Sequence, residues 1–322
     1  MEDDPGADEE SLRDAVERSR SGAPAVGEVV RDRFGTDEVF QRIIAAADEE
    51  VTTDARELFF SALAAGFAIT LTFLIYSSMT AKTDGAPLLS ALLYPIGFIY
   101  IILGGYQLYT ENTVPPVALV LERLASVPAM LRQWWIVLVG NFAGGLFGAL
   151  ILAYTGVFSP EAAAAAIDIS QKGVETGVWD LFFKAGFAGL IVAGVVWLDF
   201  AARDTVSRFF LVYIAFLLIP LADLFHVVVS FTELMYLVFL GEAALLPGLV
   251  GFVLPVLLGN TIGGVVLVTL VNYFQTTERR VESTREDGVE RQLSLRELVG
   301  GSSVGRTYVP TDKPTKRRRE DE

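Results

Sequence analysis

The chain contains a single histidine, His226, which lies in an apolar stretch between Asp223 and Ser230. An imidazole titrates near neutral pH, so this side chain can take up or release a proton under physiological conditions. A lone histidine among apolar residues is usually a buried structural residue. Ionisable groups inside a membrane, however, are rare and mark paths for solutes or protons. The sequence therefore predicts a proton-exchanging role for His226.

The residue counts argue against a metal centre. The chain has one histidine and no cysteine, whereas a zinc site needs about three or more protein ligands. No cofactor-binding loop accompanies the histidine. We therefore expect neither a metal nor a cofactor.

A repeated polar motif is the second chemical signal. The pattern G-N-x-x-G-G begins at Gly140 and again at Gly259, 119 positions later, so Asn141 and Asn260 occupy equivalent places. An asparagine in hydrocarbon costs free energy unless its amide is hydrogen-bonded, and glycines let helix backbones approach closely. The repeat predicts two related helices that face a polar interior.

The motifs lie in long apolar stretches. Hydrophobic residues make up 52% of the 322 positions, and the mean hydropathy is +0.47. Six stretches reach or approach the roughly 20 residues that cross a bilayer. They are residues 58–79, 88–108, 134–157, 181–198, 209–230 and 248–272. The first stretch follows an acidic segment, whereas a signal peptide opens with a basic one. The sequence predicts an all-α, multi-pass membrane protein in the lipid bilayer.

The two halves of this region resemble each other. The first stretch begins Leu58-Phe59-Phe60 and the fourth Leu181-Phe182-Phe183, and each soon reaches Gly-Phe-Ala. Three crossings per half make the second half enter from the opposite face, which predicts an inverted 3+3 repeat. Pro115-Pro116 follows the second stretch and Pro220 interrupts the fifth, so we expect helices two and five to be broken.

Charge is distributed unevenly. The net charge is −14, and only five of the basic residues are lysine. An acidic, lysine-poor and cysteine-free chain suits a salt-rich cytoplasm and predicts a halophilic source. Arginine residues are concentrated in the predicted loops near 109–133 and 199–208 and at the start of the C-terminal tail. The positive-inside rule therefore places both termini in the cytoplasm.

Three regions follow from these patterns. Residues 1–35 form an acidic tail, expected to be disordered, and residues 276–322 form a charged cytoplasmic tail. Residues 36–275 form the transmembrane domain, which opens with an amphipathic helix over 36–52. The run Lys316-Arg317-Arg318-Arg319 is expected to be a solvated segment near lipid headgroups and not a nucleic-acid site.

Four features together resemble the formate/nitrite transporter family. Leu108-Tyr109-Thr110-Glu111-Asn112 is similar to the family's L-F-T-G-N loop in its broken second helix. His226 falls at the place of its central pore histidine. Asn141 and Asn260 fit the motifs of its third and sixth helices, and Lys172 matches a lysine of its outer vestibule. The resemblance covers residues 36–275.

The resemblance implies an aquaporin-like homopentamer in the plasma membrane, with one pore in each six-helix protomer. Its members move small monovalent anions such as formate or nitrite. In this chain His226 would exchange a proton with the anion or attract it, and Thr110 would hydrogen-bond near it. Leu108 and Tyr109 would form an apolar constriction, and Lys172 would draw anions to the outer mouth.

The chain also departs from the family pattern. Phe225 and Ser230 replace a glutamate and an asparagine around the histidine, and Glu111 stands where the family has a small residue. A carboxylate beside an anion path should repel anions unless it is protonated, paired or turned away.

Three other functions remain open. A neutral-solute channel of the aquaporin type would share the repeat, although the chain has no N-P-A motif. A membrane enzyme could use Asp223, His226 and Glu233 for acid–base work, but no nucleophile elbow accompanies them. The third alternative is a non-conducting scaffold or sensor whose charged tails bind partners.

Overall fold

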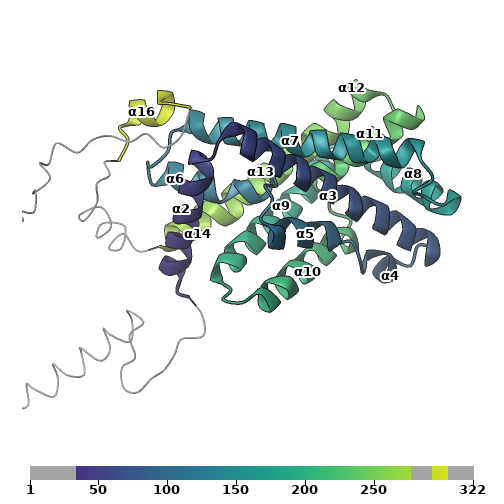
Figure 1. Ribbon diagram of the computed structural model, residues 1–322, viewed down its shortest axis with the longest axis horizontal. Coiled ribbons are helices and arrows are strands. Elements are labelled where there is room, and N and C mark those ends of the chain that lie inside the picture. Colours follow the sequence, from purple (N-terminus) through teal and green to yellow (C-terminus); the bar gives the residue numbers. More distant parts are fainter. Residues whose placement is uncertain (1–33, 277–291, 304–322) are drawn as a thin grey trace, which may run out of the picture.

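A computed structural model describes residues 34–276 and 292–303 of the chain. The predictions for most of both tails, including the Lys316–Arg319 run, lie outside these residues. The regular elements in the described part are all helices, as predicted (Figure 1). The longer ones are α2 (Thr36–Thr52), α3 (Ala55–Lys82), α5 (Ile96–Gly104), α7 (Val127–Tyr154), α8 (Pro160–Glu175), α9 (Val178–Ala201), α10 (Thr205–Leu221), α11 (Val227–Leu240) and α13 (Leu254–Gly264). Shorter pieces are α4 (Pro87–Ala91), η1 (Glu111–Thr113), α6 (Pro115–Leu121), α12 (Leu245–Gly248), η2 (Leu249–Val253), η3 (Val265–Leu270), α14 (Val271–Gln275) and α16 (Leu295–Gly300).

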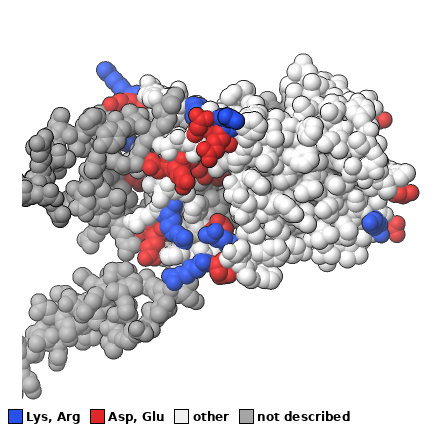
Figure 2. All heavy atoms as spheres, in the orientation of Figure 1, with Lys and Arg blue, Asp and Glu red and all other residues white. Residues whose placement is uncertain are grey.

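The helices of the described residues can provide the six predicted crossings. Five helical stretches are long and apolar enough to span a bilayer, and they are 55–82, 87–104, 127–154, 178–201 and 245–275. The remaining crossing is made by two shorter apolar helices, α10 and α11. Charged side chains gather at the end that carries α2 and at the opposite tip, with a broad uncharged face between them (Figure 2). This pattern fits a bilayer that surrounds the middle of the molecule.

The helices differ from the prediction in two places. The fifth stretch was expected to end at 230, with a loop over 231–247, but α11 continues to Leu240. The break itself lies after Leu221, next to Pro220 where the sequence predicted it, and Asp223 adopts a left-handed φ of 52° there. The second difference is α8, a helix between the third and fourth crossings that the sequence analysis missed. Its alanine-rich sequence is capped by the Ser159 hydroxyl, which accepts from the amide of Ala162.

Each repeated asparagine ties one half of the molecule together. The Asn141 amide nitrogen donates to the carbonyls of Ala62 in α3 and Gln107 in the loop after α5, at 2.8 and 2.9 Å. Its oxygen accepts from the amide of Tyr109 at 2.8 Å. One side chain thereby satisfies three backbone groups that no water could reach in a bilayer.

Asn260 repeats this arrangement in the second half. It donates to the carbonyls of Ala185 in α9 and Phe225 in the loop before α11, at 2.8 and 3.0 Å, and it accepts from Val227 at 2.8 Å. In each half the asparagine therefore joins the first helix to the break of the second. Both side chains are almost completely buried.

A glycine in the first helix of each half, opposite the motif asparagine, permits this close approach. A Cβ at Gly66 would collide with the carbonyl of Asn141, and one at Gly189 with the carbonyl of Asn260. The last glycine of each motif faces the other half instead. Gly145 packs on Thr232 in α11, and Gly264 on Thr113 in η1. The motif thus holds each half together and also joins the halves.

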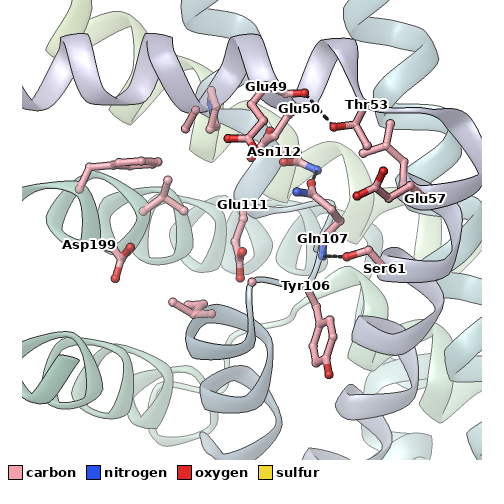
Figure 3. A pocket seen from close by; sticks show the side chains of 17 residues that line it. Glu49, Glu50, Thr53, Glu57, Ser61, Tyr106, Gln107, Glu111, Asn112 and Asp199 are labelled. Atoms are coloured by element: carbon pink, nitrogen blue, oxygen red, sulfur yellow. Dashed lines mark hydrogen bonds between the residues drawn. The ribbon is translucent and has the colours of Figure 1, made fainter.

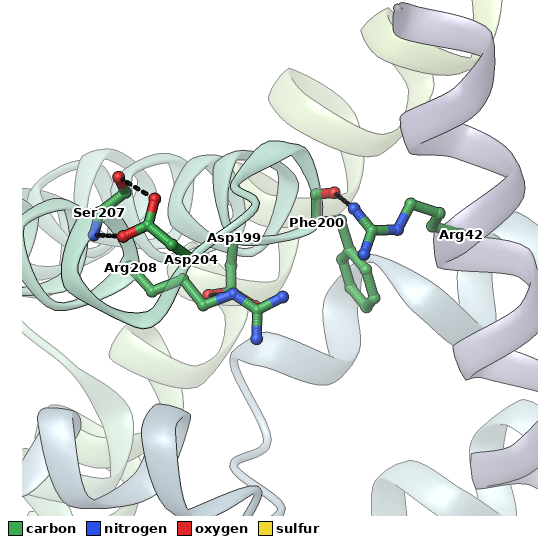
Figure 4. A network of polar contacts seen from close by, with 6 residues as sticks. All are labelled: Arg42, Asp199, Phe200, Asp204, Ser207 and Arg208. Carbon is green, nitrogen blue, oxygen red and sulfur yellow. Dashed lines mark hydrogen bonds and ion pairs between the residues drawn. The ribbon is translucent and has the colours of Figure 1, made fainter. Parts of the chain in front are cut away.

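The amphipathic pattern over 36–52 corresponds to α2. Val39, Phe40 and Ile43 are buried against Val114 and Val196, while the polar face is exposed. Arg42 donates to the carbonyl of Phe200 at 2.7 Å, and Arg208 lies 3.5 Å from Asp199 (Figure 4). The first contact attaches α2 to the end of α9, and the second joins α10 to the same end.

Part of the predicted C-terminal tail packs on the domain. Leu293 is buried, and its amide donates to the carbonyl of Arg123 at 2.9 Å. The Ser126 hydroxyl donates to the carbonyl of Ser302 at 2.6 Å. These contacts place α16 beside the start of α7, an arrangement that composition could not reveal.

Replacing Asn260 by alanine should destabilise the fold strongly. The change leaves the carbonyl of Phe225 and the amide of Val227 unpaired and removes the bond to α9, and each unpaired buried group costs about 1–3 kcal/mol. Asn272→Ala is the matched control, because the Asn272 amide bonds only a carbonyl of its own helix, that of Val268. Unfolding in detergent measures both. Equal stability of the two variants would contradict the bridging role.

Candidate functional site

The two helix breaks meet at the centre of the domain. The first follows α5, where Gly105 takes a left-handed φ of 68°, and it carries Thr110. The second follows α10, and its last residue, His226, is the N-cap of α11. Thr110 Oγ1 and His226 Nε2 lie 2.8 Å apart in a hydrogen bond, and both residues are 1% exposed. The structure thus joins two residues that the sequence separates by more than a hundred positions.

Two stacked aromatic rings that the sequence analysis missed lie beside this hydrogen bond. The Phe98 ring meets the His226 imidazole edge-on, with centroids 5.0 Å apart, and it stacks on Phe216 at 3.9 Å. Phe98 and Phe216 occupy equivalent places in the repeat, like Gln107 and Phe225, so a full alignment of the halves could have revealed them. We call this stacked pair, which lies against one side of the only histidine, the apolar collar.

Leu108 and Tyr109 are buried beside the centre. Leu108 is fully enclosed in the main core. Tyr109 packs edge-on against Trp134, and its hydroxyl lies 2.9 Å from the hydroxyl of Thr261. Asn112 closes the same loop by donating to Gln107 Oε1 at 2.9 Å, and its carbonyl accepts from Trp134 Nε1. Neither Leu108 nor Tyr109 lines the hollows described next.

A hollow of about 370 Å³ opens at the end of the molecule that carries α2. We call it the tail-side hollow (Figure 3). Among the described residues, its lining contains five carboxylate residues and no lysine or arginine. They are Glu49, Glu50, Glu57, Glu111 and Asp199. This mouth therefore favours protons and disfavours anions.

Glu111 faces the tail-side hollow, one residue from Thr110. Its Oε1 is buried and has no hydrogen-bond partner among the described residues. Neither ion pair of the described residues includes Glu111, so a cation does not neutralise its carboxyl, and the side chain lines the hollow instead of turning away from it.

A second hollow, of about 260 Å³, opens near the other end of α3 and has His226 in its lining. We call it the opposite hollow. Ser61 of α3 lines the first hollow and Tyr76 the second, which places them about 22 Å apart along the helix. Lys172 lines the opposite hollow, and its ammonium lies 2.5 Å from Asp223. The positive charge predicted to draw anions is therefore offset by a carboxylate.

The comparisons with known proteins agree with this architecture. Residues 37–274 match the protein-family model described as "Formate/nitrite transporter", which is well over half of the chain. The chain belongs to the formate/nitrite transporter family. It is 31% identical over 242 residues to the inner membrane protein YfdC of Escherichia coli (strain K12), which covers 74% of this chain and 77% of that protein. The match to the family model and this relative together confirm the predicted family and exclude the enzyme alternative.

Two solved structures share the fold. One, described as an "FNT family ion channel", superposes with a TM-score of 0.66 at 21% identity and covers 74% of this chain and 99% of its own. The other, a "Pentameric formate channel with formate bound", gives 0.59 at 20% identity, with 69% and 97% coverage. The predicted all-helical channel fold is confirmed.

Glu50 should make stability depend on pH. Its burial, only partly opposed by hydrogen bonds from Gln133 and Gln107, raises the pKa of the carboxyl from 4.5 to about 7. The folded state therefore holds an extra proton between these pH values. Stability is greatest below about pH 4.5 and falls as the pH rises through about 7.

Glu50→Gln should remove this slope and make the protein more stable than the wild type at about pH 8. Glu49→Gln, an exposed neighbour in the same hollow, should keep the wild-type slope. Unfolding midpoints in detergent between about pH 5 and 8 test both variants. A wild-type slope in Glu50→Gln would show that Glu50 is not responsible.

Proposed function

We propose that this protein is a channel for small monovalent weak-acid anions such as formate or nitrite. The solute would pass between the two hollows and exchange a proton with His226 at the centre. The main support is the Thr110–His226 hydrogen bond, which lies between the hollows in a chain of this family. A bare anion is disfavoured in an apolar collar, so a proton supplied there lowers the barrier.

Each of the other predicted residues has a place in this scheme. Thr110 holds the imidazole in position, and Leu108 and Tyr109 stiffen the collar from behind. Lys172, paired with Asp223, supplies a positive group at the opposite mouth. Asn141, Asn260 and Asn112 hold the two breaks in place and do not contact the solute.

We also propose the assembly and the orientation. The protein forms a homopentamer in the cell membrane, with both termini in the cytoplasm. The pentameric formate channel that shares its fold supports this assembly. Arg42, Arg203 and Arg208 near α2 support the orientation. The acidic, lysine-poor composition supports a halophilic source.

Replacing His226 by phenylalanine should abolish pH-dependent formate flux, because the ring keeps its bulk but cannot carry a proton. Uptake into proteoliposomes at high salt, measured against pH, tests the proposal. Thr110→Val should weaken flux less, since it removes only the positioning hydrogen bond. Flux and pH profile equal to the wild type in His226→Phe would refute the central role.

Glu111→Gln should increase anion flux at neutral pH if solutes reach the tail-side hollow as anions, because it removes an unpaired carboxyl from the lining. Glu242→Gln removes an exposed carboxylate outside both hollows and is the control.

The five carboxylates of the tail-side hollow specifically favour a second candidate function, passage of a neutral solute. An unchanged rate in Glu111→Gln would support that candidate.

A further inference from the structure

Three polar side chains form a stripe along the first two turns of α11. His226, Ser230 and Glu233 are spaced i, i+4 and i+7, so they share one face of the helix. All three line the opposite hollow, although their exposures are only 1%, 1% and 7%. The rest of α11 is almost entirely apolar. The stripe runs from the centre of the domain into the hollow.

Two atoms of this stripe have no partner among the described residues. They are Nδ1 of His226 and Oγ of Ser230. A buried polar atom without a hydrogen bond costs about 1–3 kcal/mol, and an apolar side chain would avoid that cost. The hollow has room for several water molecules, each of which occupies about 30 Å³. These atoms are therefore placed to bond mobile molecules in the hollow.

The two nitrogens of His226 have different surroundings. Nε2 is bonded to Thr110 at the centre, whereas Nδ1 is free. The edge-on contact with Phe98 fixes the ring in this orientation. One nitrogen is thus available to receive a proton from the hollow while the other faces the collar.

Glu233 stands at the outer end of the stripe. The two ion pairs of the described residues join Lys172 to Asp223 and Arg208 to Asp199, so neither includes Glu233. The titratable and charged groups around it line the same hollow from α3, the α4–α5 turn, α8 and the second break. They are Tyr76, Tyr94, Asp168, Lys172, Asp223 and His226. Carboxyl groups outnumber the single lysine, so the hollow attracts protons.

We propose that Glu233, Ser230 and His226 form a proton relay from the opposite hollow to the centre of the channel. The inference rests on the proposed function and identifies the source of the proton that His226 delivers. Neighbours at i and i+4 have Cβ atoms about 6 Å apart, so one water in the hollow can bridge each step.

The transfer balances in protons and charge. The carboxyl O–H of Glu233 breaks as its proton passes through a bridging water to the Ser230 hydroxyl, and the proton of that hydroxyl passes in the same way to Nδ1 of His226. The N–H at Nε2 then breaks, and an O–H forms on the anion beside Thr110. Glu233 takes a new proton from water in the hollow. One proton and one anion give one neutral acid, and the three residues regain their starting charges. The imidazole ends as its Nδ1–H tautomer, and exchange of one proton with water on each side, off at Nδ1 and on at Nε2, restores the Nε2–H form.

Ser230→Ala and Glu233→Gln test the relay in the purified full-length protein. Formate uptake and internal acidification are measured together in proteoliposomes between about pH 6 and 8. Both variants should lose the rise in uptake at low pH, with a fall of about tenfold or more at pH ~6. Ser230→Thr keeps the hydroxyl and should keep the wild-type pH profile.

Two controls separate the relay from general effects. Ser77→Ala removes another buried hydroxyl without a partner, one that does not line the hollow. Asp168→Asn removes an exposed carboxylate from the same mouth. Both should keep the wild-type profile. A loss in Asp168→Asn equal to that in Glu233→Gln would overturn the relay in favour of a surface-charge effect.

The same vesicles distinguish the two proposals. If His226→Phe abolishes flux while Ser230→Ala and Glu233→Gln behave as the wild type, the relay is wrong and the proposed function stands. If the wild type carries no formate at any pH, both proposals fall. Loss of the pH profile in the two relay variants, with Ser230→Thr unaffected, supports the relay.

Discussion

The fold depends on satisfying the backbone of two helix breaks at membrane depth. A bare amide or carbonyl there has no water to bond, so irregular chain persists only where protein groups supply the partners. Asn141 and Asn260 supply them, and each bonds two carbonyls and one amide. Because each asparagine also bonds the first helix of its half, the breaks are held at a fixed position in the interior.

The two halves share this scaffold but carry different chemistry. The first break carries Thr110 and Glu111, and the second carries His226 with Ser230 and Glu233 on the helix that follows it. The inverted arrangement brings the breaks together, so Thr110 and His226 bond across the centre. Phe98 and Phe216, which are equivalent in the repeat, stack beside them. A near-symmetric frame thus encloses an asymmetric polar site.

The charges that line the two hollows do not simply attract anions. The tail-side hollow is lined by five carboxylates, and in the opposite hollow the only lysine is paired with Asp223. Both mouths therefore concentrate protons more than anions. This favours a mechanism in which the solute spends little of its path as a bare anion, and it gives Glu233 and Glu111 distinct places on the two sides of the collar.

The sequence alone determined the membrane class, the crossings, the duplication and the broken helices, because hydropathy, spacing and proline are local properties of the chain. The motifs also carried the family and named both His226 and Thr110. Only the tertiary structure decided that Lys172 is offset by Asp223, that Glu111 is unpaired, that α11 extends to Leu240 and that α16 docks on α7. Pairing and burial depend on which distant segments meet, and that is a property of packing which no local pattern contains.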